Sequence, residues 1–212
     1  SGPSGLQLGR DPTNAPCNLC FLLRKRSLIS YILSTMMLNS VVILDFGSQY
    51  TQLIARRCRE LGIFSELMLF DTPLEEIKKR KPIAIILSGG PNSVDDPGAP
   101  LRSVKELLGV APVLGICYGM QLLAQDLGGK VDRAEAREYG FNQVQWKEKI
   151  AAVPTDQRVW MSHGDVITQP PAGARVVAWS LNQHPAAMVG PNYWAVQFHP
   201  EVAHTDHGTE FL

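Results

Sequence analysis

The sequence has no apolar run close to the roughly 18 residues that a membrane-spanning helix needs. The longest candidate, residues 28–38, is interrupted by Ser30 and Ser34. An excess of charge of one sign is also missing, because 20 basic residues balance 20 acidic ones. A net charge of zero gives no basic field that would attract nucleic acid or an anionic membrane surface. These absences predict a protein that binds neither a membrane nor nucleic acid.

Cysteine is scarce, with four residues in 212, too few for a secreted domain held together by disulfides. Cys17 and Cys20 form an isolated C-x-x-C pair, and no second pair follows at the spacing of a zinc site. His204 and His207 also lack a supporting cluster of ligands in the sequence. We therefore expect no metal site.

The first forty residues differ from the rest. Residues 1–5 (SGPSG) resemble a cloning remnant. Residues 24–26 (RKR) precede a mostly apolar stretch, as in a signal peptide, but no clear small-residue cleavage site follows. We expect residues 1–40 to be a poorly ordered leader or added extension, and residues 41–212 to form the functional domain.

From Val41 onward, short apolar segments alternate with amphipathic ones. The expected strands are 41–44, 64–70, 83–87 and 112–116, and the expected helices are 49–61, 73–80, 101–108 and 118–127. This alternation predicts an α/β fold with a mostly parallel central sheet flanked by helices. Beyond Gly129 the pattern becomes strand-rich, with strands expected at 142–146, 176–179, 186–189 and 194–198. In such sheets, sites form at the carboxyl ends of the strands.

Segment 115–119 (GICYG) has the form G-x-C-x-G between a predicted strand and a predicted helix. This is a nucleophile elbow with cysteine in place of serine, in which small flanking residues permit a sharp, strained turn. The positive end of the following helix favours thiolate over thiol at Cys117. The Tyr118 backbone N–H is free to face a developing oxyanion, and Gln121 lies one helical turn further on, placed to contact a substrate. The alternative is a buried structural cysteine.

A cysteine nucleophile needs a base, and the base needs an orienting group. His199 and Glu201 follow the predicted strand 194–198. In an extended chain, residues two apart point to the same side, so the Glu201 carboxylate can lie against the His199 imidazole. Pro200 limits the freedom of the backbone between them. The alternative is a surface histidine beside a surface glutamate.

Two other segments allow more than one interpretation. Segment 162–165 (SHGD) contains the residue types of a hydrolytic triad, but adjacent residues on one turn rarely converge, so we interpret it as a substrate-binding loop or an ordinary turn. Segment 88–93 (SGGPNS) lacks the G-K-[ST] ending of a phosphate loop. It is a plain glycine turn, or it supplies a second oxyanion donor from the Gly90 N–H.

Five motifs in order resemble those of the class I glutamine amidotransferases: DFGSQY at 45–50, SGGP at 88–91, GICYGMQ at 115–121, MSHGD at 161–165 and FHPEV at 198–202. The resemblance covers about residues 41–212. The first and fourth motifs are most similar to the glutaminase domains of the GMP synthetase branch. Two features depart from the family: the 212 residues contain no synthetase half with a second nucleotide-binding domain, and residues 140–161 are shorter than usual. Residues 1–40 also have no counterpart.

The resemblance implies a role for each of these residues. Cys117 attacks the side-chain amide of glutamine, His199 moves protons and Glu201 orients His199. The backbone N–H groups of Gly90 and Tyr118 form the oxyanion hole.

The resemblance also implies that Gln121, His163 and Asp165 surround the glutamine, with Asp165 as the partner of its α-ammonium group. The products are glutamate and ammonia. In this branch the ammonia passes to an ATP-pyrophosphatase (synthetase) domain or subunit, which aminates XMP to GMP. No cofactor is expected for the glutaminase domain, since ATP and magnesium belong to the synthetase domain. A cytoplasmic location is implied as well.

Two alternatives remain open at this point. One is the glutaminase of another class I amidotransferase or a related cysteine hydrolase. The other is a catalytically silent docking or regulatory module of the same fold.

Overall fold

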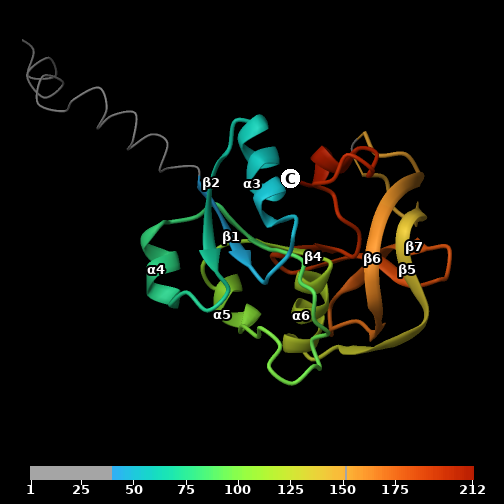
Figure 1. Ribbon diagram of the computed structural model, residues 1–212, viewed down its shortest axis with the longest axis horizontal. Coiled ribbons are helices and arrows are strands. Elements are labelled where there is room, and N and C mark those ends of the chain that lie inside the picture. Colours follow the sequence, from blue (N-terminus) through green and yellow to red (C-terminus); the bar gives the residue numbers. More distant parts are fainter. Residues whose placement is uncertain (1–39, 151) are drawn as a thin grey trace, which may run out of the picture. The chain divides into compact units, whose positions relative to one another are not determined.

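The computed structural model describes residues 40–150 and 152–212. The leader predicted over residues 1–40 therefore lies outside the described residues, except for Ser40. Within the described residues, one nine-stranded sheet has the strand order β2-β1-β3-β4-β9-β8-β7-β5-β6. Figure 1 shows β1 and β2 toward one side of this sheet and β5, β6 and β7 toward the other. None of the described helices is long and apolar enough to cross a membrane.

Four strands form the parallel half of the sheet: β1 (Ser40–Asp45), β2 (Phe64–Leu69), β3 (Ala84–Leu87) and β4 (Val113–Ile116). β1 pairs in parallel with both β2 and β3, and β3 pairs in parallel with β4. β1 and β3 are continuous apolar runs because helices cover both of their faces. The strands predicted for this part of the chain are all present.

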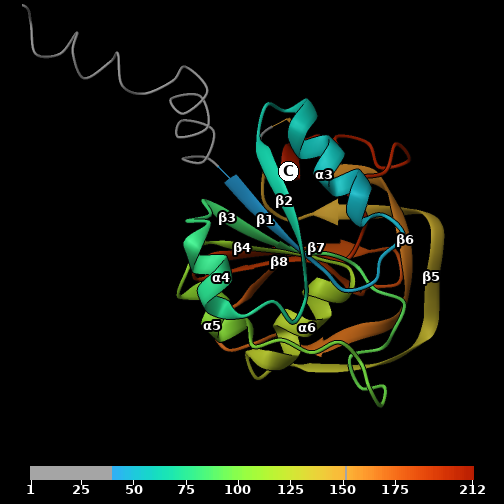
Figure 2. The ribbon, with the colours of Figure 1, turned by 60° about the vertical axis from the view of Figure 1, so that its left-hand side comes forward.

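Helices pack against both faces of this half of the sheet (Figure 2). They are α3 (Thr51–Glu60), α4 (Leu74–Lys79), α5 (Val104–Leu108) and α6 (Tyr118–Asp126). Successive residues of a strand point to opposite faces. Ile43 of β1 accordingly joins the core cluster of α3, and Leu44 joins the cluster of α4, α5 and α6. This α/β layering brings the carboxyl ends of β1, β3 and β4 together at one edge.

The second half of the chain adds β5 (Lys130–Trp146), β6 (Asp156–Gln169), β7 (Arg175–Ser180), β8 (Pro185–Gly190) and β9 (Tyr193–Val196). β9 joins the two halves, since it pairs in parallel with β4 and antiparallel with β8. β5 and β6 form a long antiparallel hairpin at the far edge (Figure 1). The sheet is therefore mixed, with a parallel half and an antiparallel half. A 3-10 helix, η2 (Gly208–Phe211), follows the last strand.

One prediction is wrong in this half. The expected strands do not include residues 156–169, and segment 162–165 is predicted as a loop or an ordinary turn, whereas both belong to β6. Burial alternates along β6, as in any half-buried strand, but the buried set includes Gln157, His163 and Asp165. Because these buried positions are polar, the sequence of β6 does not alternate between apolar and polar residues, which is the pattern that predicts a half-buried strand.

Candidate active site

Cys117 lies between the end of β4 and the start of α6, at the carboxyl edge of the parallel strands. Its φ of 51° and ψ of −107° are a strained conformation for a residue other than glycine. The flanking glycines are required because the turn is tight. A Cβ at Gly115 would lie 2.7 Å from the Gly119 carbonyl oxygen, and a Cβ at Gly119 would collide with the Leu87 carbonyl oxygen. The predicted elbow is therefore present.

The structure brings His199 and Glu201 together, with 2.8 Å between His199 Nδ1 and Glu201 Oε1. Both side chains are almost fully buried. The chain is not extended here, as the sequence argument assumed, but bends through residues 197–201. The backbone of His199 is held instead by hydrogen bonds to neighbours: its N–H donates to the Trp160 carbonyl at 3.0 Å, and its carbonyl accepts from Thr205 Oγ1 at 2.6 Å.

The charge state of His199 depends on its burial and on its neighbours Cys117 and Glu201. Burial lowers the pKa of His199, but the Cys117 thiolate and the Glu201 carboxylate outweigh it and raise this pKa to about 10. Since Nδ1 of His199 faces Glu201, Nε2 is left for the thiol. His199 is therefore present as the imidazolium at neutral pH.

The two predicted oxyanion donors lie next to each other. A Cβ built on Gly90 would lie 3.2 Å from Tyr118 Cγ, so the loop after β3 packs directly on the start of α6. Among the described residues, neither the Gly90 nor the Tyr118 backbone N–H donates a hydrogen bond. A Cβ on the neighbouring Gly89 would lie 3.1 Å from His199 Cε1 and 3.7 Å from Cys117 Cβ. The loop can therefore present N–H groups to an oxyanion beside Cys117.

Two cavities meet at Cys117, and both are also lined by Gly90, Pro91 and Ser162. The first cavity, of about 110 Å³, extends along α6 and β6 and is lined by Gln121, His163 and Asp165, among others. The second cavity, of about 190 Å³, extends to the loop after β1 and is lined by residues 47–50 and His199. The thiol is therefore approached from two sides, and His199 is on only one of them.

The three residues expected around the glutamine line the first cavity, each in a different way. Gln121 Nε2 donates to the Asp165 carbonyl at 3.3 Å and to Gln197 Oε1 at 3.2 Å. Both ring nitrogens of His163 lie close to protein oxygens, with Nδ1 2.9 Å from the Asp165 carbonyl and Nε2 2.9 Å from Glu138 Oε2. Asp165 Oδ1 is buried, lies 3.6 Å from Arg133 Nε and has no hydrogen bond among the described residues. This oxygen is available to a ligand.

Several residues at the site are not among those predicted from the sequence. Tyr50 packs edge-on against the His199 ring, with 5.1 Å between ring centroids. Arg137 and Tyr139 line the first cavity from β5, next to a bulge between Arg133 and Glu138. Such bulges often redirect side chains beside active sites. No motif in the sequence marks the bulge, since it depends on how β5 pairs with β6.

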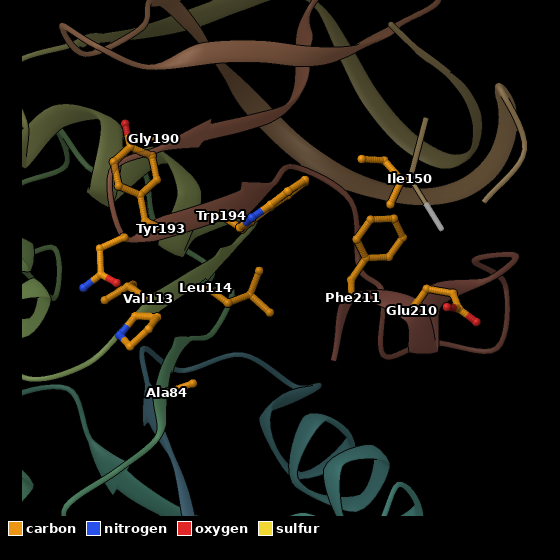
Figure 3. A pocket seen from close by; sticks show the side chains of 11 residues that line it. Ala84, Val113, Leu114, Ile150, Gly190, Tyr193, Trp194, Glu210 and Phe211 are labelled. Carbon is orange, nitrogen blue, oxygen red and sulfur yellow. The ribbon is translucent and has the colours of Figure 1, made fainter. Parts of the chain in front are cut away.

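A larger cavity, of about 430 Å³, lies away from Cys117 at the amino ends of β3, β4 and β9. Figure 3 shows Leu114, Trp194 and Phe211 around it. It contains none of the predicted site residues, so its size does not make it the reactive centre. Among the described residues, no group of three or more histidine, cysteine or acidic side chains is placed to hold a metal ion.

A comparison with protein families supplies the deciding observation. The model of the family described as glutamine amidotransferase class-I matches residues 42–212. The chain belongs to this family. The family predicted from the five motifs is therefore confirmed, and so is the α/β fold class.

Among curated relatives, GMP synthase (glutamine-hydrolyzing) from Bdellovibrio bacteriovorus is 60% identical over 175 residues, which cover 82% of this chain and 35% of the relative. GMP synthase (glutamine-hydrolyzing) from Thermus thermophilus is 52% identical over 176 residues, which cover 81% of this chain and 35% of the relative. The chain thus spans about a third of the length of these relatives.

Solved structures agree with this fold. A protein from Thermoplasma acidophilum assigned as a GMP synthase subunit is 28% identical, with a TM-score of 0.73 over 82% of this chain and 90% of its own. A glutamine amidotransferase from Thermotoga maritima is 24% identical, with a TM-score of 0.60 over 78% of this chain and 77% of its own, and shows the shared fold alone.

Proposed function

We propose that this chain is the glutaminase part of a GMP synthase and hydrolyses glutamine to glutamate and ammonia for the amination of XMP. The observation that carries the proposal is the strained Cys117 elbow, facing a His199–Glu201 pair whose nitrogen and oxygen are 2.8 Å apart. The family match and the names of the curated relatives support the choice of glutamine and of GMP synthesis.

In the proposed reaction, Cys117 Sγ attacks the side-chain amide carbon of glutamine. The oxygen of that amide becomes an oxyanion, which the free N–H groups of Gly90 and Tyr118 stabilise. His199 then gives its proton to the amide nitrogen, the carbon–nitrogen bond breaks, and ammonia leaves a glutamyl thioester on Cys117. Water attacks the thioester while His199 takes its proton, the carbon–sulfur bond breaks, and glutamate leaves the Cys117 thiolate. Glu201 orients the imidazole throughout.

The two cavities take different parts in this reaction. The first cavity holds the glutamine, because its wall contains Asp165 Oδ1, a buried carboxylate oxygen without a hydrogen bond among the described residues that suits an α-ammonium group. The second cavity is on the side of His199, which protonates the leaving nitrogen and activates the water. Ammonia therefore leaves, and water enters, along the loop at residues 47–50.

The proposed partner is an ATP-pyrophosphatase domain or subunit that receives the ammonia and aminates XMP. ATP and magnesium act in that partner, and the glutaminase part uses no cofactor of its own. The Thermoplasma acidophilum protein, assigned as a GMP synthase subunit, supports a partner on a separate chain as one arrangement. A cytoplasmic location belongs to the same proposal.

The test is release of glutamate from L-glutamine by the purified chain and by its Cys117→Ala variant. The proposal predicts measurable release by the parent and a loss of at least about a thousandfold in the variant, whose fold is checked by circular dichroism. Equal release by both proteins would refute the role of Cys117. Release by neither, even with a synthetase partner present, would favour a silent docking module.

A further inference from the structure

A buried carboxylate, that of Glu138, lies behind the wall of the first cavity and takes no part in the proposed reaction. Its side chain is only 1% exposed. The register of β5 against β6 sets Glu138 directly opposite His163, so the two side chains share one face of the hairpin. A carboxylate in such a place is costly unless neighbours compensate its charge.

Compensating groups surround the Glu138 carboxylate. Oε2 lies 2.9 Å from His163 Nε2 and 3.7 Å from His184 Nδ1, and Oε1 accepts a 3.0 Å hydrogen bond from Asn182 Nδ2. The 2.9 Å contact is not aligned as a hydrogen bond, and it is attractive when His163 Nε2 carries a proton. Burial raises the pKa of Glu138, but His163, Ser180 and His184 outweigh it and lower this pKa to about 2. Glu138 is therefore ionised at neutral pH.

His163 connects Glu138 to Asp165, because its other ring nitrogen contacts the Asp165 backbone. A backbone carbonyl can only accept a hydrogen bond, so His163 Nδ1 donates to the Asp165 carbonyl across 2.9 Å. The same carbonyl accepts from Gln121 Nε2. Two side chains thus tether the Asp165 backbone, and one of them is itself held by Glu138. The Asp165 carboxylate is left to face the first cavity.

We propose that Glu138 is a positioning residue, which fixes His163 and through it the Asp165 carboxylate that recognises the α-ammonium group of glutamine. This inference rests on the proposed function, since it assigns Glu138 to the same glutamine site. Glu138 touches no substrate atom. Its influence is on recognition of the amino-acid end of the substrate, not on the reactivity of Cys117.

The test compares the parent chain with Glu138→Gln, which keeps the shape of the side chain and removes its charge. Glu135→Gln is the matched control, because Glu135 is an exposed carboxylate on the same strand. Alkylation of Cys117 is followed by mass spectrometry with two reagents: a diazoketone analogue of glutamine, which carries the α-ammonium group, and iodoacetamide, which does not. The KM and kcat for L-glutamine are measured in parallel.

Glu138→Gln is expected to slow alkylation by the glutamine analogue about tenfold, the size of one lost charge-assisted interaction, and to change the iodoacetamide rate less than about twofold. The KM for glutamine rises accordingly, with kcat nearly unchanged. The double variant with His163→Gln is expected to be no worse than His163→Gln alone, because both act along one chain of contacts. Unchanged selectivity, an equal loss with both reagents, or additive effects in the double variant would overturn the proposal.

A second variant and a second measurement cover the cases in which Glu138→Gln does not fold or the parent chain is inactive. If Glu138→Gln does not fold, Asn182→Ala removes one anchor of the carboxylate and is expected to lower selectivity for the glutamine analogue about threefold, and unchanged selectivity there would count against the proposal. If the parent itself neither releases glutamate nor prefers the glutamine analogue, the proposed function fails. The contact between Glu138 and His163 would then still be testable by the ¹⁵N NMR shifts of the His163 ring.

Discussion

At the scale of single residues, the elbow stores strain at the nucleophile. Cys117 has a positive φ, a conformation that glycine adopts at little cost. Cys117→Gly should therefore be more stable than Cys117→Ala by about 1 kcal/mol, because relieved strain of roughly 1–3 kcal/mol outweighs the extra chain entropy of glycine. Urea denaturation of the two variants measures this difference. A Cys117→Ala variant that is the more stable of the two would show that the turn is not strained.

His199 determines the alkaline limit of activity. Its pKa is raised to about 10, so the imidazolium that protonates the leaving nitrogen is present at neutral pH and is lost as the pH rises through about 10. Glu201→Gln removes one of the charges that raise this pKa, so the alkaline limb of kcat/KM should move to lower pH by about one unit or more. Glu201→Gln should also slow turnover less than His199→Ala does. If the alkaline limb of the kcat/KM profile lies at the same pH in Glu201→Gln and in the parent, Glu201 does not act on His199.

Sequence reasoning reaches some of these residues and not others, for physical reasons. Cys117, His199 and Glu201 belong to short motifs in which neighbours in sequence are also neighbours in space, as the 2.8 Å contact between His199 and Glu201 illustrates. Glu138 carries no such signal. Its contact with His163 depends on the register between the long strands β5 and β6 and on a bulge that shifts this register.

At the scale of elements, the elbow needs β3, β4 and α6 in close contact. A Cβ at Gly119 would collide with the Leu87 carbonyl, whose backbone cannot move without breaking the sheet. Gly119→Ala should therefore destabilise the fold by about 3 kcal/mol or more. Gly109→Ala, at an exposed helix end, is the control and should cost less than about 1 kcal/mol. Thermal denaturation measures the stability of both variants. A loss of stability in Gly119→Ala as small as that in Gly109→Ala would contradict this packing.

The two cavities can be filled separately. Gln49 is exposed and lines only the second cavity, and Asn92 is exposed and lines only the first. Gln49→Trp should slow attack of water on the thioester, so kcat and KM fall together while kcat/KM changes less than about twofold. Asn92→Trp should raise KM several-fold by narrowing the glutamine cavity. Steady-state kinetics separate the two effects, and a raised KM in Gln49→Trp would reverse the assignment of the cavities.

Sequence patterns predict some strands and helix ends of this fold and not others. Strands β1 and β3 are predictable because both of their faces carry buried apolar residues. β6 is not, because the buried Gln157, His163 and Asp165 interrupt its apolar face. α5 begins at Val104, three residues after the expected start, because the carboxylate of Asp126 caps the backbone N–H groups of Val104 and Lys105. That capping group comes from another helix, which no local pattern reveals.

At the scale of the whole molecule, the proposal describes one half of a coupled reaction. Uncoupled hydrolysis would waste glutamine, so the chain alone should hydrolyse glutamine slowly. A GMP synthase ATP-pyrophosphatase partner, with ATP and XMP, should raise the rate. The loop at residues 88–93 is a candidate switch, because it carries the Gly90 donor and glycine turns reorient at low cost. Glutamate release at saturating glutamine, with and without the partner, measures this coupling, and a high rate that the partner leaves unchanged would refute it.

The most direct test of the central claim follows the amide nitrogen itself. The chain is mixed with the ATP-pyrophosphatase partner, ATP, magnesium, XMP and glutamine labelled with ¹⁵N in its side-chain amide, and the GMP formed is analysed by mass spectrometry. We expect ¹⁵N in the amino group of GMP with the parent chain and none with Cys117→Ala, whereas added ammonium restores GMP formation in that variant. Unlabelled GMP from the parent, or labelled GMP from Cys117→Ala, would contradict the account.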